Sequence, residues 1–223
     1  TSRRSDGYHN LQTIFQLVDY CDEININYRS DGVIDRISGN EHIPKNQDLI
    51  IRSATLLKKI TGSKGGADIA IVKKIPIGGG LGGGSSNAAT VLIALNKLWN
   101  LNLPREELVD IGQNLGADVP VFINGHSSWG EGIGEILTPI SLPKYFYLIV
   151  TIGKHISTKE IFTHKALTMS PVQRKIANFS MVSNPHNDCL DAAIHLEADI
   201  EKAIAHLDST ENHLGIARMT GSG

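Results

Sequence analysis

Cysteine is scarce in this chain of 223 residues, since Cys21 and Cys189 are the two present and lie far apart. They form neither a CxxC pair nor the dense spacing of a secreted disulfide framework. We therefore expect two reduced thiols in a reducing cytoplasm, where disulfides rarely persist. The nine histidines form no HxxxH or HExxH pair, so the sequence gives no indication of a zinc site.

Long hydrophobic runs and a strong net charge are also lacking. The longest apolar run, residues 145–152, is far shorter than the roughly 20 residues of a membrane helix. The formal net charge of −2 gives no general attraction to nucleic acid or to an anionic membrane. We therefore expect no nucleic-acid or membrane partner, and the sequence implies no protein partner.

The first part of the chain alternates between strand and helix patterns. Residues 22–28 and 67–75 predict strands, the former with Ile24, Ile26 and Tyr28 on one face. A helix is expected over 48–60, with Asn46 as its cap. The spacing of its apolar positions predicts a buried side made of Leu49, Ser53, Leu56 and Ile60.

The second part begins with a strongly amphipathic helix after residue 84. Its apolar positions have a period of 3.6, and Ser85 or Ser86 is expected to cap its start. Those positions are Ala88, Val91, Leu92, Leu95, Leu98 and Trp99. A further helix is expected over 104–116 and an apolar strand over 145–152. Because the elements do not alternate as regular βαβ units, the pattern favours an α+β fold, divided near residues 138–143 into domains 1–140 and 141–223.

Residues 76–89 read PIGGGLGGGSSNAA, in which six of the seven positions from 78 to 84 are glycine. A strand, a glycine loop and a helix N-terminus together form an anion site, because free amides point outward and the helix dipole adds positive charge. Glycines leave no Cβ to hold phosphate oxygens away. The candidate nucleotide-binding residues are Pro76, Gly78, Gly79, Gly80, Leu81, Gly82, Gly83, Gly84, Ser85, Ser86 and Asn87. The hydroxyls of Ser85 and Ser86 also suit Mg²⁺.

Three different roles for this glycine loop fit the sequence less well. A structural turn with capping serines would need one or two glycines. The Walker A motif is excluded, because no Lys-Ser/Thr pair follows the last glycine. Gly78, Gly80 and Gly83 match the dinucleotide-binding spacing. However, the acidic residues about 20 positions on, Glu106 and Glu107, lie in a predicted helix start rather than after a strand.

The loop resembles the second motif of the GHMP small-molecule kinases. Three further segments are similar to one branch of this family: DGYHNLQT at 6–13, LGADVPVF at 115–122 and TGSG at 220–223. That branch phosphorylates the 2-hydroxyl of 4-diphosphocytidyl-2-C-methyl-D-erythritol in the non-mevalonate isoprenoid pathway. The resemblance implies an N-terminal nucleotide-binding domain, a smaller C-terminal substrate domain, and ATP and Mg²⁺ as cofactors.

The resemblance also assigns roles to residues outside the loop. Asp118 corresponds to the catalytic aspartate, and a carboxylate there could accept the hydroxyl proton; the alternative is a helix cap or turn residue. Tyr8 is expected to stack on cytosine and His9 to hydrogen-bond its edge, with Phe162 as the second aromatic. Thr158 and Phe15 are weaker substrate-binding candidates. Core packing is the alternative for Phe15 and Phe162.

Two departures accompany this resemblance. Asp48 stands where relatives carry an asparagine near the adenine, and the N-terminal Pro-x-Lys-x-Asn motif of the family is absent from these residues. The segment that follows the TGSG loop in the family is also missing, so we expect both ends of the sequence to be truncated. Two alternatives remain open, a sister kinase of the homoserine, mevalonate or galactose type and a non-catalytic nucleotide-binding relative.

Overall fold

The computed structural model describes residues 1–5, 7, 9–154, 156–168, 186–209 and 217–222. The chain forms two compact units. Unit 1 comprises residues 1–12, 76–81 and 143–223, and unit 2 comprises residues 13–75 and 82–142. The glycine loop is thereby shared, because residues 76–81 belong to unit 1 and the helix that follows belongs to unit 2.

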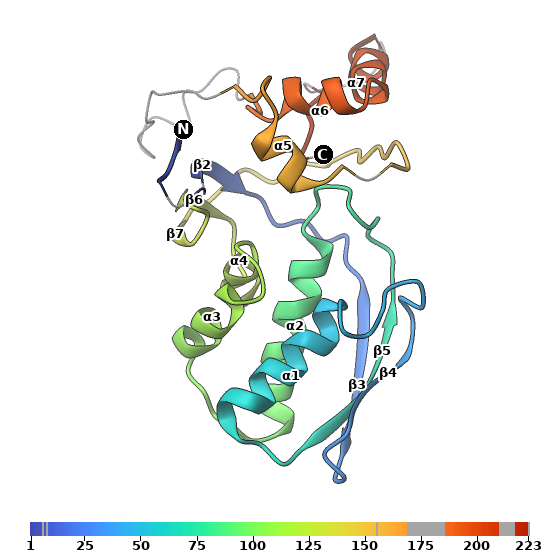
Figure 1. The fold of residues 1–223 in the computed structure, drawn as a ribbon, viewed down its shortest axis with the longest axis vertical. Coiled ribbons are helices and arrows are strands. Elements are labelled where there is room, and N and C mark those ends of the chain that lie inside the picture. Colours follow the sequence, from blue (N-terminus) through green and yellow to red (C-terminus); the bar gives the residue numbers. More distant parts are fainter. Residues whose placement is uncertain (6, 8, 155, 169–185, 210–216, 223) are drawn as a thin grey trace. The chain divides into compact units, whose positions relative to one another are not determined.

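Unit 2 contains a three-stranded sheet of order β3-β5-β4, formed by Glu23–Arg29, Gly66–Val72 and Ile34–Ser38 respectively. β3 and β5 are antiparallel from Glu23↔Val72 to Arg29↔Gly66, whereas β4 and β5 are parallel. Helices α1 and α2 pack on this sheet through a shared core (Figure 1). Ile24 and Ile26 pack against that core, but Tyr28, which was predicted to share their face, is 54% exposed.

Helix α1 (Leu49–Thr61) occupies the expected place with a different cap and a different face. Its N-cap is Asp48, whose carboxylate accepts a hydrogen bond from the Ile50 amide, so the prediction of Asn46 was wrong. The buried residues are Ile50, Ser53, Ala54 and Leu57. Of the predicted face, Ser53 is buried and Leu49 and Leu56 pack partly buried against the core, whereas Ile60 is 54% exposed. Two adjacent apolar stripes on this helix made the choice ambiguous.

Helix α2 (Gly83–Leu98) crosses the core of unit 2, and its predicted apolar face is confirmed. Ala88, Val91, Leu92 and Leu95 are fully buried. Helices α3 (Arg105–Gln113) and α4 (Val119–Asn124) pack beside it, with Leu108, Ile111, Val119 and Ile123 joining the same core. The buried face of α2 begins at Gly83, so the start of the helix packs against the core of unit 2.

The remaining strands are short. β1 (Ser2–Arg3) pairs antiparallel with the start of β2 (His9–Phe15) in unit 1. In unit 2, β6 (Ser128–Gly132) pairs antiparallel with β7 (Ile136–Pro139). Phe15, the last residue of β2, packs on Gly130 of β6, where an added Cβ would approach the ring within 2.6 Å.

Unit 1 has its own core around helices α5 (Thr158–Thr163), α6 (Leu190–Leu196) and α7 (Asp199–Ser209). Ile156, Ile161, Ala192, Ala193 and Ile200 are buried there. The strand predicted over 145–152 is wrong for this structure, since those residues form no ladder and Leu148 is 79% exposed. A strand needs a hydrogen-bonded neighbour as well as an apolar sequence.

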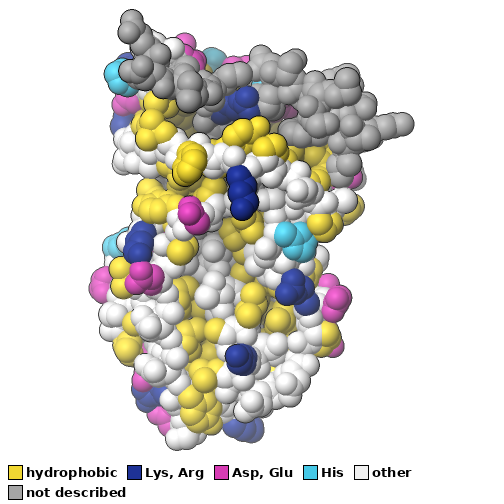
Figure 2. All heavy atoms as spheres, turned by 180° about the vertical axis from the view of Figure 1, so that it is seen from behind, with side chains coloured by type: hydrophobic (Ala, Val, Ile, Leu, Met, Phe, Trp, Pro, Cys, Tyr) yellow, Lys and Arg dark blue, Asp and Glu magenta, His cyan; other side chains and the backbone are white. Residues whose placement is uncertain are grey.

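The described surface carries charges of both signs. On the face shown in Figure 2, basic and acidic side chains are interspersed rather than gathered into a field of one sign. Throughout the residues that the structure describes, no helix combines the length and the hydropathy needed to cross a membrane.

Candidate active site

The glycine loop has a backbone that few other residues could adopt. Gly78, Gly80 and Gly82 have φ values of 73°, 65° and 65°, in the left-handed region that glycine enters without penalty. Gly82 is the N-cap of α2 and accepts the first helical hydrogen bond, from the Ser86 amide, at 2.9 Å. The amides of Gly83, Gly84 and Ser85 precede this bond and have no partner within the helix.

The predicted serine cap is wrong. Ser85 and Ser86 lie inside the first turn of α2, and the N-cap residue, Gly82, makes no side-chain hydrogen bond. A glycine at this position leaves the helix end open, because it has no side chain to occupy the amides. The first turn of α2 is therefore better suited to an external anion than a serine-capped helix would be.

Protein side chains also approach the glycines closely. An added Cβ on Gly83 would lie 2.9 Å from Ile75 Cγ2 and 3.2 Å from Lys73 Nζ. One on Gly82 would lie 2.9 Å from the ring of Phe122. Part of the glycine content thus serves packing inside unit 2, in addition to any ligand.

Asp22, which immediately precedes β3, binds both ends of the loop. Its Oδ1 accepts hydrogen bonds from the amides of Lys74 (2.7 Å) and Ile75 (2.8 Å). Its Oδ2 accepts from Lys73 Nζ (2.5 Å) and from Asn87 Nδ2 (2.9 Å). Burial works to raise the pKa of Asp22, but these four bonds outweigh it and hold the pKa below its ordinary value. Asn87 therefore directs its amide into the protein.

Sequence reasoning missed Asp22. No local signal distinguishes Asp22 from any other acidic residue before a strand, because its donors come from residues more than 50 positions away. Asp48 has a similar buried role. In addition to capping α1, its Oδ2 accepts from Arg36 Nη1 at 2.5 Å, which explains why a carboxylate is stable at this position.

Asp118 lies in the Gly116–Asp118 turn, at the N-cap position of α4, without a side-chain capping bond. The side chain keeps an exposed surface, yet the protein atoms packed around it remove hydration, and this burial raises its pKa. The turn borders the first turn of α2, since an added Cβ on Gly116 would lie 3.8 Å from Ser85 Oγ. Unit 2 thus brings the turn that carries this carboxylate beside the first turn of α2.

Two of the predicted cytosine-binding residues, His9 and Phe162, form an aromatic pair in unit 1. The rings of His9 and Phe162 are 5.1 Å apart between centroids and inclined at 37°. Burial and then the positive charge of Arg3 lower the pKa of His9, which favours the neutral imidazole. A neutral imidazole can both donate and accept a hydrogen bond. Tyr8 lies outside the described residues.

The other predicted residues have partners in their own units. Thr158 Oγ1 and Ser222 Oγ are 2.8 Å apart, and Thr220 Oγ1 donates to the Gly80 carbonyl at 3.4 Å, all within unit 1. The TGSG segment therefore contacts both Thr158 and the first half of the glycine loop. Phe15 packs on Gly130, in line with the core-packing alternative.

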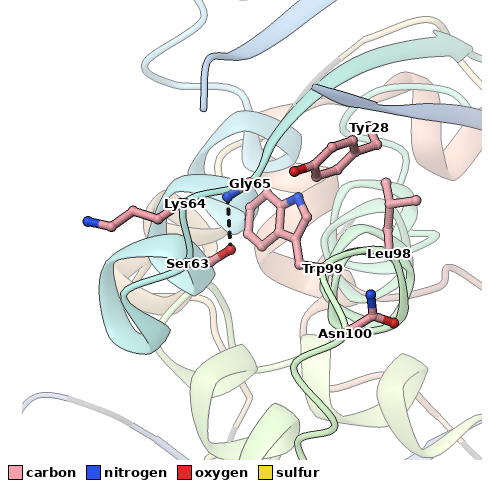
Figure 3. Close-up of a pocket in the computed structure, with 7 residues that line it drawn as sticks. All are labelled: Tyr28, Ser63, Lys64, Gly65, Leu98, Trp99 and Asn100. Atoms are coloured by element: carbon pink, nitrogen blue, oxygen red, sulfur yellow. Dashed lines mark hydrogen bonds between the residues drawn. The ribbon is translucent and has the colours of Figure 1, made fainter. Parts of the chain in front are cut away.

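A surface hollow of about 410 Å³ lies at the other end of α2 and involves none of the predicted site residues. Figure 3 shows Tyr28 and Leu98 beside Trp99, with Ser63, Lys64, Gly65 and Asn100 around them. The 16 residues of α2 span about 24 Å, so this hollow is separate from the end of α2 that follows the glycine loop.

The oxygen atoms near the α2 N-terminus fit a magnesium ion. Ser85 supplies a half-exposed hydroxyl, and the Gly116–Asp118 turn beside it carries a carboxylate. Mg²⁺ prefers such oxygen donors and is usually held by one or two of them together with substrate phosphates. In the described part of the chain, no three His, Cys, Asp or Glu side chains form a cluster suited to a metal.

Comparison with known proteins agrees with this geometry. Residues 48–126 match the family model described as GHMP kinases N terminal domain. The chain is 59% identical over its full length to a 4-diphosphocytidyl-2-C-methyl-D-erythritol kinase of Ruthia magnifica, covering 78% of that relative. It is 46% identical to the enzyme of the same name from Cupriavidus necator, covering 77% of it.

Solved structures give the same result. A crystal structure of 4-(cytidine 5'-diphospho)-2C-methyl-D-erythritol kinase matches 99% of this chain and 81% of its own, with a TM-score of 0.77 and 30% identity. L. major mevalonate kinase matches with a TM-score of 0.52 and 19% identity over 69% of this chain and 53% of its own, which indicates a shared fold alone. The predicted α+β, GHMP-type fold is confirmed, whereas the division at residue 140 stays a prediction. The chain belongs to the family of 4-diphosphocytidyl-2-C-methyl-D-erythritol kinases, within the GHMP kinases.

Proposed function

We propose that this protein transfers the γ-phosphoryl group of ATP to the 2-hydroxyl of 4-diphosphocytidyl-2-C-methyl-D-erythritol. As a GHMP kinase it uses ATP and a small-molecule acceptor. The observation that carries the proposal is in unit 2, where the turn of Asp118 borders the uncapped first turn of α2. One segment can bind phosphate while the other addresses the alcohol.

In this mechanism Asp118 acts as the base or orienting group for the hydroxyl. The hydroxyl oxygen forms a bond to the γ-phosphorus as the bond to the β-γ bridging oxygen breaks, and the hydroxyl proton passes to the carboxylate. Burial supports this role, because it raises the pKa of Asp118 and so makes its carboxylate a stronger base. Phosphoryl transfer depends mainly on positioning and charge neutralisation, which a loose transition state requires.

The nucleotide phosphates would be bound by amides of the loop from Gly78 to Ser86. A Mg²⁺ ion held by Ser85, with Ser86 and Asp118 as neighbouring oxygen donors, would neutralise phosphate charge when bound. Asn87 acts in this scheme through the fold rather than through the ligand, because its amide donates to Asp22.

The cytosine end of the substrate would be bound in unit 1. The ring of Phe162 offers a stacking surface, and the neutral imidazole of His9 offers a donor and an acceptor for the base edge. Tyr8 would supply the second stacking ring, with Thr158 as a further candidate. We also infer that the reaction takes place in the cytoplasm without a protein or nucleic-acid partner. The two unpaired cysteines support that compartment.

An ADP-release assay on the expressed protein tests the proposal. We expect turnover with 4-diphosphocytidyl-2-C-methyl-D-erythritol and at most trace turnover with mevalonate, homoserine or galactose. Turnover with one of those alcohols instead would assign the chain to another branch. ATP binding without turnover of any of the four would favour a non-catalytic nucleotide-binding relative.

A further inference from the structure

The base of the glycine loop in unit 2 is joined by one buried carboxylate. Asp22 has a side chain only 1% exposed and accepts four hydrogen bonds. These come from two segments: residues 73–75, which precede the loop, and Asn87 of α2, which follows it. A buried carboxylate is stable when it is paired and fully hydrogen-bonded, as Asp22 is.

The two carboxylate oxygens have separate tasks. Oδ1 binds the amides of Lys74 and Ile75, the last residues before the loop. Oδ2 binds Asn87, which follows the loop, and Lys73. Gly83, where α2 begins, lies so close that an added Cβ would be 3.2 Å from Lys73 Nζ. The entry and the exit of the loop are therefore fixed to a single group.

We propose that Asp22 is a positioning residue for the nucleotide. It holds Asn87, and with it the first turn of α2, against residues 73–75, so that the amides of residues 83–85 stay aligned for phosphate. It also holds the Lys73 ammonium beside the start of α2. This role rests on the proposed function, since it concerns how the same loop binds ATP. Asp22 itself touches no substrate in this scheme.

The first test is the affinity of a fluorescent ATP analogue for Asp22→Asn, measured without turnover. The amide oxygen can still accept from residues 74 and 75, but its NH₂ group faces the donors Lys73 and Asn87. Losing buried, charge-assisted hydrogen bonds predicts about 10- to 100-fold weaker binding. We expect KM for ATP to rise by a similar factor and KM for the cytidine-containing substrate to stay within about twofold.

Glu23→Gln is the matched control. Glu23 is the next residue and pairs with the next lysine, Lys74, but this pair is on the surface and makes no bond to the loop backbone. We expect its nucleotide affinity to equal that of the wild type. Equal losses in Glu23→Gln and Asp22→Asn would overturn the proposal, because the effect would then be one of general charge.

Two further variants separate positioning from direct contact. Asn87→Ala removes the hydrogen bond from α2 to Asp22 without leaving a buried positive charge unpaired. If Asp22→Asn does not fold, this variant tests whether that bond is needed for nucleotide affinity. The exchange Asp22→Asn with Asn87→Asp restores an amide–carboxylate bond in the opposite direction. Partial recovery of affinity supports positioning. Affinity below that of Asn87→Ala would indicate that residue 87 faces the phosphates, and would overturn it.

The binding measurement also keeps this inference distinct from the proposed function. Absence of turnover in the wild type, with normal analogue binding that Asp22→Asn weakens, would contradict the proposed reaction alone. Folded Asp22→Asn and Asn87→Ala variants that bind the analogue as tightly as the wild type would contradict the role of Asp22 alone.

Discussion

The base of the glycine loop and the aromatic pair are built in contrasting ways. In unit 2 the loop base is fixed by a buried carboxylate with four hydrogen bonds and by glycines that leave almost no free space. In unit 1 the pair consists of His9 on a strand and Phe162 on a six-residue helix whose N-cap makes no side-chain bond. One region presents backbone held by a rigid frame, and the other presents side chains.

This difference has a chemical reason. Phosphate is recognised by several amides that must point to one place, so small backbone shifts are costly. A base is recognised by ring faces, which tolerate small changes in angle. Substitutions in unit 2 should therefore change kcat or ATP binding, and those at the aromatic pair should change KM for the cytidine-containing substrate.

The largest expected effect follows from Asp118→Asn. Loss of a positioned general base typically costs about 10²- to 10⁴-fold in rate, so we expect kcat to fall within that range with both KM values little changed. Steady-state kinetics measure this, with Asp110→Asn, an exposed aspartate on α3, as the control. A fall of less than tenfold would mean that Asp118 is a turn residue rather than the base.

Phe162→Ala should have the next largest effect, and it tests the aromatic pair of unit 1. Stacking on an aromatic ring contributes roughly 1–3 kcal/mol per base, so KM for the cytidine-containing substrate should rise about 5- to 150-fold. KM for ATP should not change. Phe162→Leu keeps apolar volume without a ring face, so a full rescue by leucine would assign Phe162 to the core.

Two alanine substitutions in the loop separate packing from phosphate binding. Gly83→Ala would force its Cβ to within 2.9 Å of buried Ile75, and such overpacking typically costs about 1–3 kcal/mol, or roughly 2–12 °C in Tm. In Gly79→Ala the new Cβ would lie at an ordinary contact distance of 3.5 Å from Pro76, so Tm should not change.

The affinity of the Gly79→Ala variant for ATP then reports on phosphate binding without a change in packing. If loop amides bind phosphate, the new methyl group should raise KM for ATP about fivefold or more, an effect of roughly 1 kcal/mol. Calorimetric melting and ATP titration measure the two quantities. An unchanged KM in Gly79→Ala would mean that this glycine is needed only for the backbone path.

The smallest expected effect is on pH dependence. Burial raises the pKa of Asp118, so kcat at saturating substrates should fall in acid at a higher pH than the ordinary aspartate value of about 3.9 would give. The native state also binds this proton more tightly than the unfolded chain. Its contribution to stability therefore decreases as pH rises between the two pKa values. At a pH above both pKa values, Asp118→Asn should have a Tm no lower than that of the wild type. A lower Tm would contradict a raised pKa for Asp118 in the native state.

Local sequence patterns predicted the buried faces of the unit 2 helices to different degrees. The 3.6-residue period after residue 84 predicted the buried face of α2 because one apolar stripe dominates there. On α1 two stripes compete, and packing on the sheet selected Ile50, Ala54 and Leu57. In unit 1 the apolar residues 145–152 have strand character, but pairing is a property of the neighbour as well as of the segment.

The sequence by itself determined that a strand, a glycine loop and a helix follow one another, and it predicted an anion site where they meet. Those features need only local spacing and the conformational freedom of glycine. Only the tertiary structure decided that Asp22 joins the two ends of the loop, that Gly82 rather than a serine begins α2, and that the turn of Asp118 borders Ser85. These contacts join residues far apart in the chain, and hydrogen-bond partners and close packing at such separations are set by the folded core rather than by sequence spacing.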